Sequence, residues 1–497
     1  MRQAQVQRAW AEYLLTNDGM SEDNQDSALS AVLADASSPE PLQQVSGHIR
    51  QSLYQDYYFD QKVDHFGLRG NSTFKQRFYI NSNSYVPGGP IYLFNSGETP
   101  ALPSYLTGGQ PYMLAKATGG MLIIMEHRYY GTSYPVSDMS GPNMLYLTIE
   151  NSLEDIAHFV RNAPKFVKET IGVTISPQTK WVATGGSYSA NIAIWLRQKY
   201  PELFHAAYAS SAPILALADF YQYDQVVGRA LPCAQNISDA IVTLDYILDS
   251  KNELLIYRWK QAFGLEGLSD NSDFAGALTD QLSNTVQYYM PPAKGSNAPD
   301  SIATLCSWFK GPKNIPLQNL ADMTAAYIRN NGINPVFAYT SNSGAKNTML
   351  YQDGRSWFYQ TCTQFGYWQS APRAPLRRLR SKYMTAEWQN RPCREFFGDD
   401  VPNQPDTTSI NNKFGGLFPN VTRVVFVNGL MDPWSELSVA SDPGIAMKMS
   451  EGNRNVVITM PKASHVTDFY FSSNRNDFGV DIARKKILAA IKDFLAQ

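Results

Sequence analysis

Short apolar runs alternate with amphipathic stretches along most of this 497-residue chain. Continuous apolar runs predict buried strands, which we place at residues 74–80, 90–94, 120–125, 181–184, 205–210, 423–428 and 455–460. Apolar residues at helical spacing predict helices at residues 147–161, 191–200 and 481–496. Strands that are apolar throughout and alternate with helices indicate a parallel sheet that is covered on both faces.

A turn of small residues separates one of these strands from its helix. It reads Gly185-Gly186-Ser187-Tyr188-Ser189 and joins the strand at 181–184 to the helix at 191–200. A strand, a tight turn centred on serine and a helix together form the nucleophile elbow of an α/β-hydrolase. The usual elbow has glycine two residues after the serine, and we expect the small side chain of Ser189 to be tolerated there. The competing interpretation is an ordinary turn serine.

The order of the chain then selects the partners of Ser187. In this fold the catalytic residues follow one another as serine, acid and histidine. Only His205 and His465 follow Ser187, and His205 is too close to leave room for an acid and its strand. Asp432 follows the strand at 423–428 and is the candidate acid, although an aspartate there could also simply cap a turn. Asp468 comes after the histidine and so breaks the expected order. We therefore predict Ser187, Asp432 and His465 as a catalytic triad.

The tetrahedral intermediate of acyl transfer needs two N–H donors. We expect one from the backbone of Tyr188 and the other from Gly97, in the loop after the strand at 90–94. His127 and Arg128 end another strand, and we expect His127 to be a structural residue near the site. Glu98, with Glu126 and Arg128, fits either an ion-pair network, which we favour, or the recognition of a peptide terminus.

Helical periodicity dominates the middle of the chain, where strand-like runs are rare. We predict an α/β class protein with a hydrolase core in two parts, residues 51–214 and 413–497, and a mostly helical cap domain inserted at residues 215–412. Residues 1–50 are rich in small and polar residues, which favours a loosely packed lead-in over a pro-segment.

Composition excludes several classes of protein. The chain has 42 Lys and Arg against 44 Asp and Glu, so it lacks the strongly basic surface of a nucleic-acid-binding protein. No apolar run reaches the length of a membrane span. Metal-binding and nucleotide-binding motifs are absent, and we expect no cofactor. The oligomeric state stays open.

Signals of location conflict. The N-terminus has no apolar signal-peptide core, which by itself favours the cytosol. Three N-glycosylation sequons, at Asn71, Asn236 and Asn420, and an even number of cysteines without metal spacing oppose this. We expect a secreted, vacuolar or lysosomal protein whose leader is not part of this chain.

Several segments together resemble the prolyl carboxypeptidase family of serine peptidases, which includes dipeptidyl peptidase II and fungal acid prolyl endopeptidases. The matching segments are Tyr58–Phe66, Glu126–Gly131, Gly185–Ser189, Cys362–Gln364, Asn428–Gly429, Asp432–Trp434 and Ala463–His465. The resemblance implies an α/β-hydrolase core with a helical cap, the same triad, cleavage after proline and activity in acid.

The resemblance also implies roles for binding residues and cysteines. Trp434 matches a position of the family's proline pocket, and Tyr367 and Asn191 stand where a relative carries methionines. That departure weakens the expected proline preference. The resemblance pairs Cys233 with Cys306 and Cys362 with Cys393, and the alternative is four reduced core cysteines.

Our prediction is a serine peptidase that hydrolyses peptides or proteins on the carboxyl side of proline through an acyl-enzyme. We rank endopeptidase or carboxypeptidase above dipeptidyl peptidase. The alternatives on the same fold are an esterase or lipase and a binding protein with an inactive site.

Overall fold

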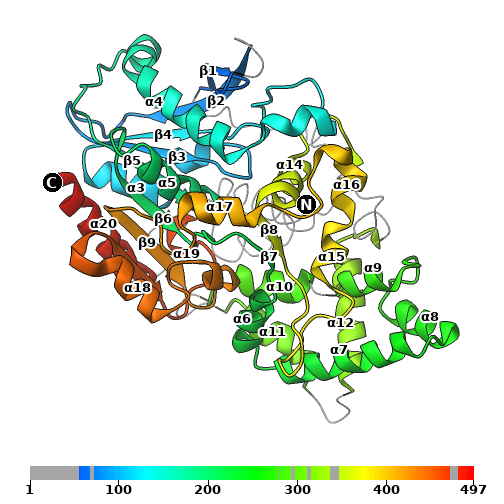
Figure 1. Cartoon of the computed structure of the whole chain (residues 1–497). Helices are drawn as coiled ribbons and strands as arrows, with labels where there is room; N and C mark the ends of the chain where they lie inside the picture. The colour runs from blue at the N-terminus through cyan, green and yellow to red at the C-terminus, as the bar shows by residue number, and fades with distance from the viewer. Residues whose placement is uncertain are drawn as a thin grey trace.

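The computed structural model describes residues 55–67, 72–278, 280–292, 297–310, 315–335, 346–470 and 479–497. The predicted lead-in at residues 1–50 and the sequon at Asn71 lie outside the described residues. An eight-stranded sheet forms the centre of one half of the molecule (Figure 1). Its strands are, in spatial order, β1 (Tyr57–Lys62), β2 (Thr73–Asn81), β4 (Met121–Met125), β3 (Ile91–Asn95), β5 (Trp181–Gly186), β6 (Phe204–Ser210), β9 (Val424–Gly429) and β10 (Val456–Met460).

The sheet is parallel from β4 to β10, whereas the pairs β1–β2 and β2–β4 are antiparallel. Strands β3, β4 and β9 are buried along their whole length, which agrees with their unbroken apolar sequence. Alternate side chains of β3 enter two separate apolar clusters, because successive side chains of a strand point to opposite faces.

Helices cover both faces of the sheet. One apolar cluster contains side chains of α4 (Ile149–Ile171) and α5 (Tyr188–Lys199), and the other contains side chains of α3 (Gly109–Ala117) and α20 (Val480–Ala496). This three-layer arrangement is that of an α/β-hydrolase core, as the sequence predicts. The carboxyl ends of its parallel strands lie at one edge, where such folds place their functional residues.

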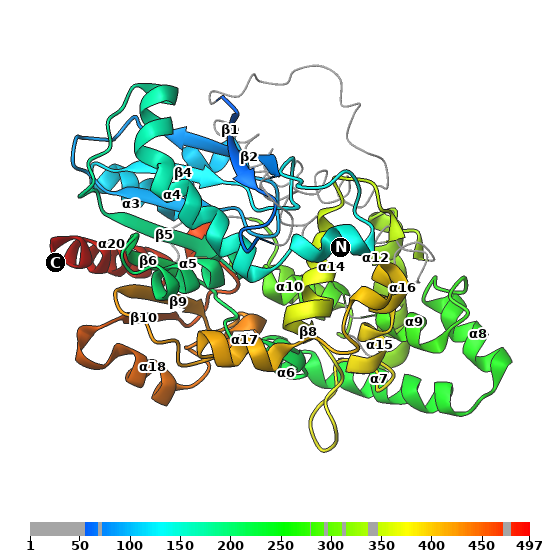
Figure 2. The same cartoon turned by 45° about the horizontal axis from the view of Figure 1, so that its top comes forward.

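A mostly helical segment lies between β6 and β9 in the sequence and occupies the other half of the molecule (Figures 1 and 2). Two short strands pair within it, β7 (Leu217–Asp219) and β8 (Gly366–Trp368). The helices are α6 (Gln222–Ala230), α7 (Ala234–Asp249), α8 (Glu253–Ala262), α9 (Asn271–Gly276), α10 (Asp280–Gln287), α11 (Ser301–Ser307), α12 (Pro316–Asn330), α14 (Asp353–Gln360), the π-helical η4 (Thr361–Phe365), α15 (Ala386–Asn390), α16 (Pro392–Phe397) and α17 (Thr407–Phe414). The helical insertion is thus confirmed, and the boundaries at 215 and 412 stay predictions.

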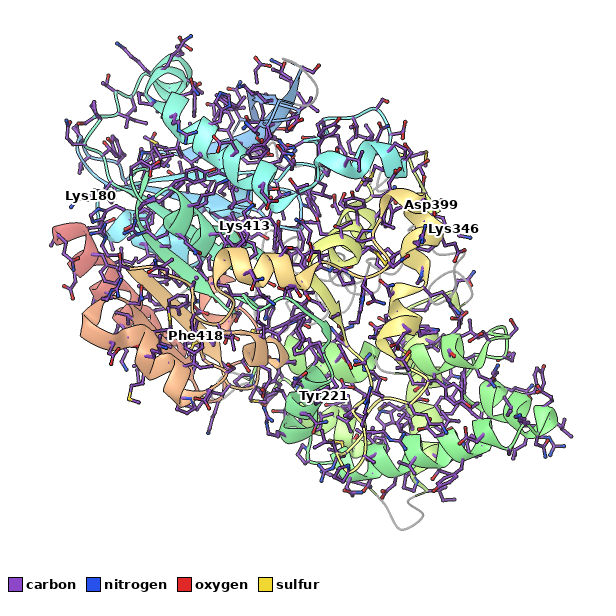
Figure 3. The ribbon with its side chains drawn as sticks, in the orientation of Figure 1. Lys180, Tyr221, Lys346, Asp399, Lys413 and Phe418 are labelled. Carbon is purple, nitrogen blue, oxygen red and sulfur yellow. A yellow bond between two sulfur atoms is a disulfide. The ribbon has the colours of Figure 1, made fainter. Side chains whose placement is uncertain are left out.

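Two disulfides cross-link this cap, and an ion pair connects it to the core. Cys233 is bonded to Cys306 and Cys362 to Cys393, the pairing that the family resemblance implies. Lys413, labelled in Figure 3, lies on α17. It pairs with Glu150 of α4, so this pair joins the last helix before β9 to the core. Both partners are partly exposed, and such pairs contribute little to stability.

Candidate active site

The predicted nucleophile occupies a strained turn between β5 and α5. Ser187 has φ of 59° and ψ of −132°, a conformation that side-chain-bearing residues rarely adopt. Its backbone N–H donates to Ser210 O on the neighbouring strand at 2.9 Å. Glycine is required at position 185, because a Cβ there would lie 2.1 Å from the backbone oxygen of Ser189. The local sequence therefore permits the close approach that the turn needs.

The three side chains of the predicted triad are in contact. Ser187 Oγ lies 2.9 Å from His465 Nε2, and His465 Nδ1 lies 2.8 Å from Asp432 Oδ2. All three are buried. Because a carboxylate only accepts hydrogen bonds, the His465 proton lies on Nδ1 and Nε2 is free to accept from the serine hydroxyl. This arrangement can remove a proton from Ser187 and return it to a leaving group.

Asp432 and His465 come from loops at the carboxyl ends of β9 and β10. Asp432 caps the short helix η6 (Pro433–Leu437), and its Oδ1 accepts from the Trp434 backbone N–H at 2.9 Å. One carboxylate oxygen is thus held by the loop while the other holds the histidine. The two interpretations of Asp432, a turn cap and a triad acid, are therefore compatible, because the cap contact and the histidine contact use different oxygens of the same side chain.

Asp468, the alternative candidate for the acid, bonds to residues other than His465. It is fully buried, and its carboxylate accepts from Tyr208 Oη at 2.5 Å and Ser210 Oγ at 2.6 Å. Burial raises the pKa of Asp468. Its contacts anchor the histidine loop to β6, and His465 bonds to Asp432 instead.

The cap also holds the histidine loop, through a residue that sequence analysis missed. Gln287, the last residue of α10, accepts at its backbone oxygen from the His465 N–H at 3.1 Å and from Ser464 Oγ at 2.8 Å. Its side-chain oxygen accepts from Trp434 Nε1 at 3.0 Å. One cap residue therefore contacts both loops that carry triad members. No local signal in the sequence marks it, because its partners in these two loops are more than 140 residues away.

The predicted oxyanion donors differ in their hydrogen bonding. Within the described part of the chain, the Tyr188 backbone N–H, at the first residue of α5, has no hydrogen-bond partner. The Gly97 N–H donates to Asn95 Oδ1 at 3.0 Å. Gly97 nevertheless lies against the serine turn, since a Cβ there would be 3.1 Å from Ser189 Cβ. Tyr188 thus offers a donor directly, and Gly97 would have to release Asn95 to offer a second.

The predicted binding residues form a buried group beside the triad. The ring of Trp434 lies 6.4 Å from that of His465 and 5.3 Å from that of Tyr367. Tyr367 Oη and Asn191 Nδ2 both donate to Pro213 O, at 2.5 and 3.0 Å. The side-chain oxygen of Asn191 is buried without a hydrogen-bond partner. Two aromatic rings and one unsatisfied amide oxygen therefore lie together next to the predicted triad.

Glu98 faces the same region. Its side chain is buried. Burial is the main reason that the pKa values of Tyr188, Tyr288 and Tyr367 are raised, and the negative charge of Glu98 raises them further. The Tyr288 ring in turn lies 6.5 Å from that of His465. Glu98 therefore lies close enough to these three tyrosines to influence their pKa values.

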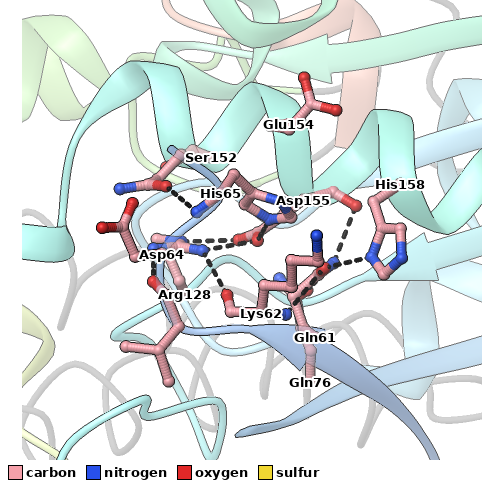
Figure 4. A network of polar contacts seen from close by, with 12 residues as sticks. Gln61, Lys62, Asp64, His65, Gln76, Arg128, Ser152, Glu154, Asp155 and His158 are labelled. Atoms are coloured by element: carbon pink, nitrogen blue, oxygen red, sulfur yellow. Dashed lines mark hydrogen bonds and ion pairs between the residues drawn. The ribbon is translucent and has the colours of Figure 1, made fainter. Parts of the chain in front are cut away.

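Arg128 has a structural environment. Its guanidinium is fully buried and donates to both carboxylate oxygens of Asp155, at 2.6 and 2.7 Å, and to three backbone carbonyls (Figure 4). His65 Nε2 lies 2.7 Å from the same carboxylate. Glu126 pairs with Arg77 at 2.5 Å. Arg128 and Glu126 are thus each in an ion pair, but their partners are Asp155 and Arg77, so the predicted network that joins them to each other and to Glu98 is not the one observed. The contacts leave Arg128 no capacity to bind a peptide terminus.

The other sequence motifs have different environments. Asn420 is exposed, whereas Asn236 lies within α7, donates to Phe309 O at 3.3 Å and precedes a buried Ser238. No described helix is both long and apolar enough to cross a bilayer. The described residues include no group of three or more His, Cys, Asp or Glu side chains arranged around a metal position.

Comparisons with known proteins agree on a family. A family model described as "Serine carboxypeptidase S28" matches residues 61–487. The "Thymus-specific serine protease" of Mus musculus is 28% identical over 90% of this chain and 89% of its own. A "Probable extracellular serine carboxypeptidase" of Arthroderma benhamiae is 27% identical over 82% of this chain and 62% of its own.

Solved structures resemble the chain only distantly. A proline iminopeptidase of Mycobacterium smegmatis is 11% identical, covers 88% of this chain and 99% of its own, and gives a TM-score of 0.36. A Pyrobaculum calidifontis esterase is 10% identical over 99% and 94% of the two chains, also with a TM-score of 0.36. These low scores carry no argument about function.

Proposed function

The chain belongs to the serine carboxypeptidase S28 family, and we propose that this serine peptidase uses Ser187, His465 and Asp432 as its catalytic triad. The observation that carries the proposal is the unbroken contact from Ser187 Oγ through His465 to Asp432. A serine hydroxyl is a weak nucleophile at neutral pH and becomes reactive beside a base whose tautomer is fixed by an acid.

The proposed reaction proceeds through an acyl-enzyme. Ser187 Oγ attacks the carbonyl carbon of the scissile bond while His465 Nε2 takes the hydroxyl proton. The Tyr188 N–H donates to the oxyanion that forms, with Gly97 as the candidate for a second donor. His465 then protonates the leaving amine, and a water molecule, deprotonated by His465, hydrolyses the ester in the second half of the reaction.

We propose proline as the preferred residue on the acyl side of the cleaved bond. Trp434 and Tyr367 supply the flat apolar surfaces against which a proline ring packs. Their rings lie 5.3 Å apart in a T-shaped arrangement close to His465. Asn191 works against this preference, because proline has no side-chain donor for its unsatisfied oxygen.

Endopeptidase or carboxypeptidase action is the first choice, and a dipeptidyl peptidase is the second candidate. The buried carboxylate of Glu98 near the triad favours the second, because a free substrate amine needs an acidic partner. We further propose an acid-active enzyme in a secreted, vacuolar or lysosomal location, glycosylated at the exposed Asn420. Two disulfides and a relative named as extracellular support that location.

Labelling and product analysis test this proposal. A fluorophosphonate probe should label the folded protein and fail to label Ser187→Ala. Mass spectrometry of the products from a long proline-containing peptide should then give fragments that end in proline. Absence of labelling would favour a binding protein with an inactive site. Rapid ester hydrolysis without cleavage of prolyl peptides would favour an esterase or lipase.

A further inference from the structure

A buried chain of hydrogen bonds connects the cap to the residue that follows the nucleophile. Tyr130 Oη lies 2.5 Å from Gln360 Oε1, Gln360 Nε2 lies 2.9 Å from Tyr188 Oη, and Tyr188 Oη lies 3.1 Å from His127 Nε2. The series of hydrogen bonds ends at the backbone oxygen of Arg128, which lies 2.7 Å from His127 Nδ1. Each of the four side chains is at most 1% exposed.

The direction of every bond in this chain is determined. A backbone carbonyl only accepts, so His127 Nδ1 carries a proton and donates to Arg128 O. The neutral ring then accepts at Nε2 from the Tyr188 hydroxyl. The hydroxyl oxygen in turn accepts from the Gln360 amide, and the Gln360 oxygen accepts from Tyr130. Burial lowers the pKa of His127 to about 4, which agrees with the neutral ring that this pattern requires.

The aromatic ring of Tyr188 is fixed as firmly as its hydroxyl. It lies 5.4 Å from the ring of Phe365, 5.6 Å from that of Trp357 and 5.6 Å from that of His127. Two of these neighbours, like Gln360, come from the cap, and His127 comes from the core after β4. The side chain therefore has one position and one rotamer, set jointly by the two halves of the molecule.

Such fixing matters because the turn at Ser187 is strained. A residue with φ of 59° keeps that conformation only where its surroundings impose it. The Ser187 N–H bond to Ser210 O holds the strand side of the turn. On the helix side, the corresponding anchor is the side chain of Tyr188, whose own backbone N–H is the proposed oxyanion donor.

We propose that Gln360 and His127 are positioning residues that hold the Tyr188 backbone amide in the oxyanion site, so that formation of this site depends on the docked cap. This inference rests on the proposed function. Neither side chain needs to touch the substrate, and both act through the Tyr188 hydroxyl. Loss of the Gln360 bond should therefore weaken transition-state stabilisation and leave ground-state binding unchanged.

The test replaces Gln360 with methionine, which has nearly the same shape and cannot donate. The matched control is Gln364→Met, since Gln364 lies four residues away in η4 with a buried side-chain oxygen that has no hydrogen-bond partner. Three quantities are measured for both: the rate constant of fluorophosphonate labelling, kcat and KM for a blocked alanyl-prolyl 4-nitroanilide, and the midpoint of thermal unfolding.

We expect Gln360→Met to lower kcat and the labelling rate constant by about 10-fold to 100-fold, with KM within about threefold of wild type. Gln364→Met should have a labelling rate constant, kinetic constants and an unfolding midpoint close to those of the wild type. Equal values for the two variants, or a loss confined to KM, would overturn the inference while the proposed function stands. A wild-type protein that is not labelled would overturn the proposed function itself.

A second variant covers the case in which Gln360→Met does not fold. Tyr188→Phe keeps the ring and its packing and removes only the hydroxyl that joins Gln360 to His127. It should show the same pattern, with a reduced labelling rate constant and kcat and an unchanged KM. Wild-type kinetics in Tyr188→Phe would contradict the inference independently of Gln360.

Discussion

Ser187 Oγ and His465 Nε2 lie 2.9 Å apart although 278 positions separate them in the sequence. The contact exists because β5 and β10 run parallel in one sheet and both end at the same edge. Folding thus places the Ser187 hydroxyl against His465. Of the described histidines that follow the nucleophile elbow in sequence, His465 is the only one near this edge of the sheet. The consequences of this contact for activity can be tested by replacing one side chain at a time.

Replacement of the base is the first prediction. His465→Ala should lower kcat by about 10⁴-fold to 10⁶-fold, because the members of a triad act as a unit. The circular dichroism spectrum should stay that of the wild type. Activity within tenfold of wild type would show that another residue takes the serine proton.

The acid is tested by a pair of matched substitutions. Asp432→Asn should lower kcat by about 10⁴-fold, because it removes the carboxylate that fixes the histidine tautomer. Asp468→Asn, the same chemical change at a residue bonded to Tyr208 and Ser210, should retain kcat within about tenfold. The reverse order of the two effects would identify Asp468 as the acid.

Asn191 should decide how strongly proline is preferred. Its unsatisfied oxygen is buried beside Tyr367 and Trp434. Asn191→Met replaces this oxygen by a flexible apolar group, and leaving such an oxygen unpaired costs about 1–3 kcal/mol. We expect kcat/KM for proline relative to alanine at the acyl position to rise by about tenfold. An unchanged ratio would show that Asn191 does not face the substrate.

The lowered pKa of His127 predicts a dependence of stability on pH. Its pKa is about 4 in the folded chain, because of burial, against 6.5 for an ordinary histidine. Below about pH 6.5 His127 therefore binds a proton in the unfolded chain, whereas in the folded chain it stays neutral until about pH 4. Over this window the free energy of unfolding should fall as the pH falls.

Denaturant unfolding of wild type and His127→Gln at pH 7, 5.5 and 4.5 isolates this contribution. Burial raises the pKa of Asp468, which gives the opposite slope, and the paired comparison removes it because both proteins contain Asp468. The wild type should lose its advantage over the variant as the pH falls. A difference that does not change with pH would contradict a neutral, buried His127.

Both disulfides should stabilise the cap. Each closes a loop within the helical insertion, one of 73 residues and one of 31. In the chain-entropy model such loops each contribute about 3–4.5 kcal/mol. Cys233→Ser with Cys306→Ser, and separately Cys362→Ser with Cys393→Ser, should lower the unfolding midpoint. Midpoints equal to that of the wild type would show that the cap is not part of the unfolding unit.

Local sequence pattern and chain order are enough to predict several parts of this protein. Continuous apolar runs at 90–94 and 120–125 predict buried parallel strands, and these are strands β3 and β4. The serine turn, followed by an aspartate after one later strand and a histidine after the next, predicts Ser187, Asp432 and His465 as a triad, and these three side chains are in contact. The predicted family is confirmed by the match over residues 61–487.

The side chains that support these residues could not be predicted in the same way. Gln360 and Gln287 reach the site from the cap, and nothing in their neighbouring sequence distinguishes them from other glutamines. The Gly97 amide, a predicted oxyanion donor, is engaged by Asn95. The physical reason is that a strand or turn follows from interactions between neighbours in the chain. A hydrogen bond between Gln360 and Tyr188 instead depends on how two segments that are 172 residues apart in the sequence pack together.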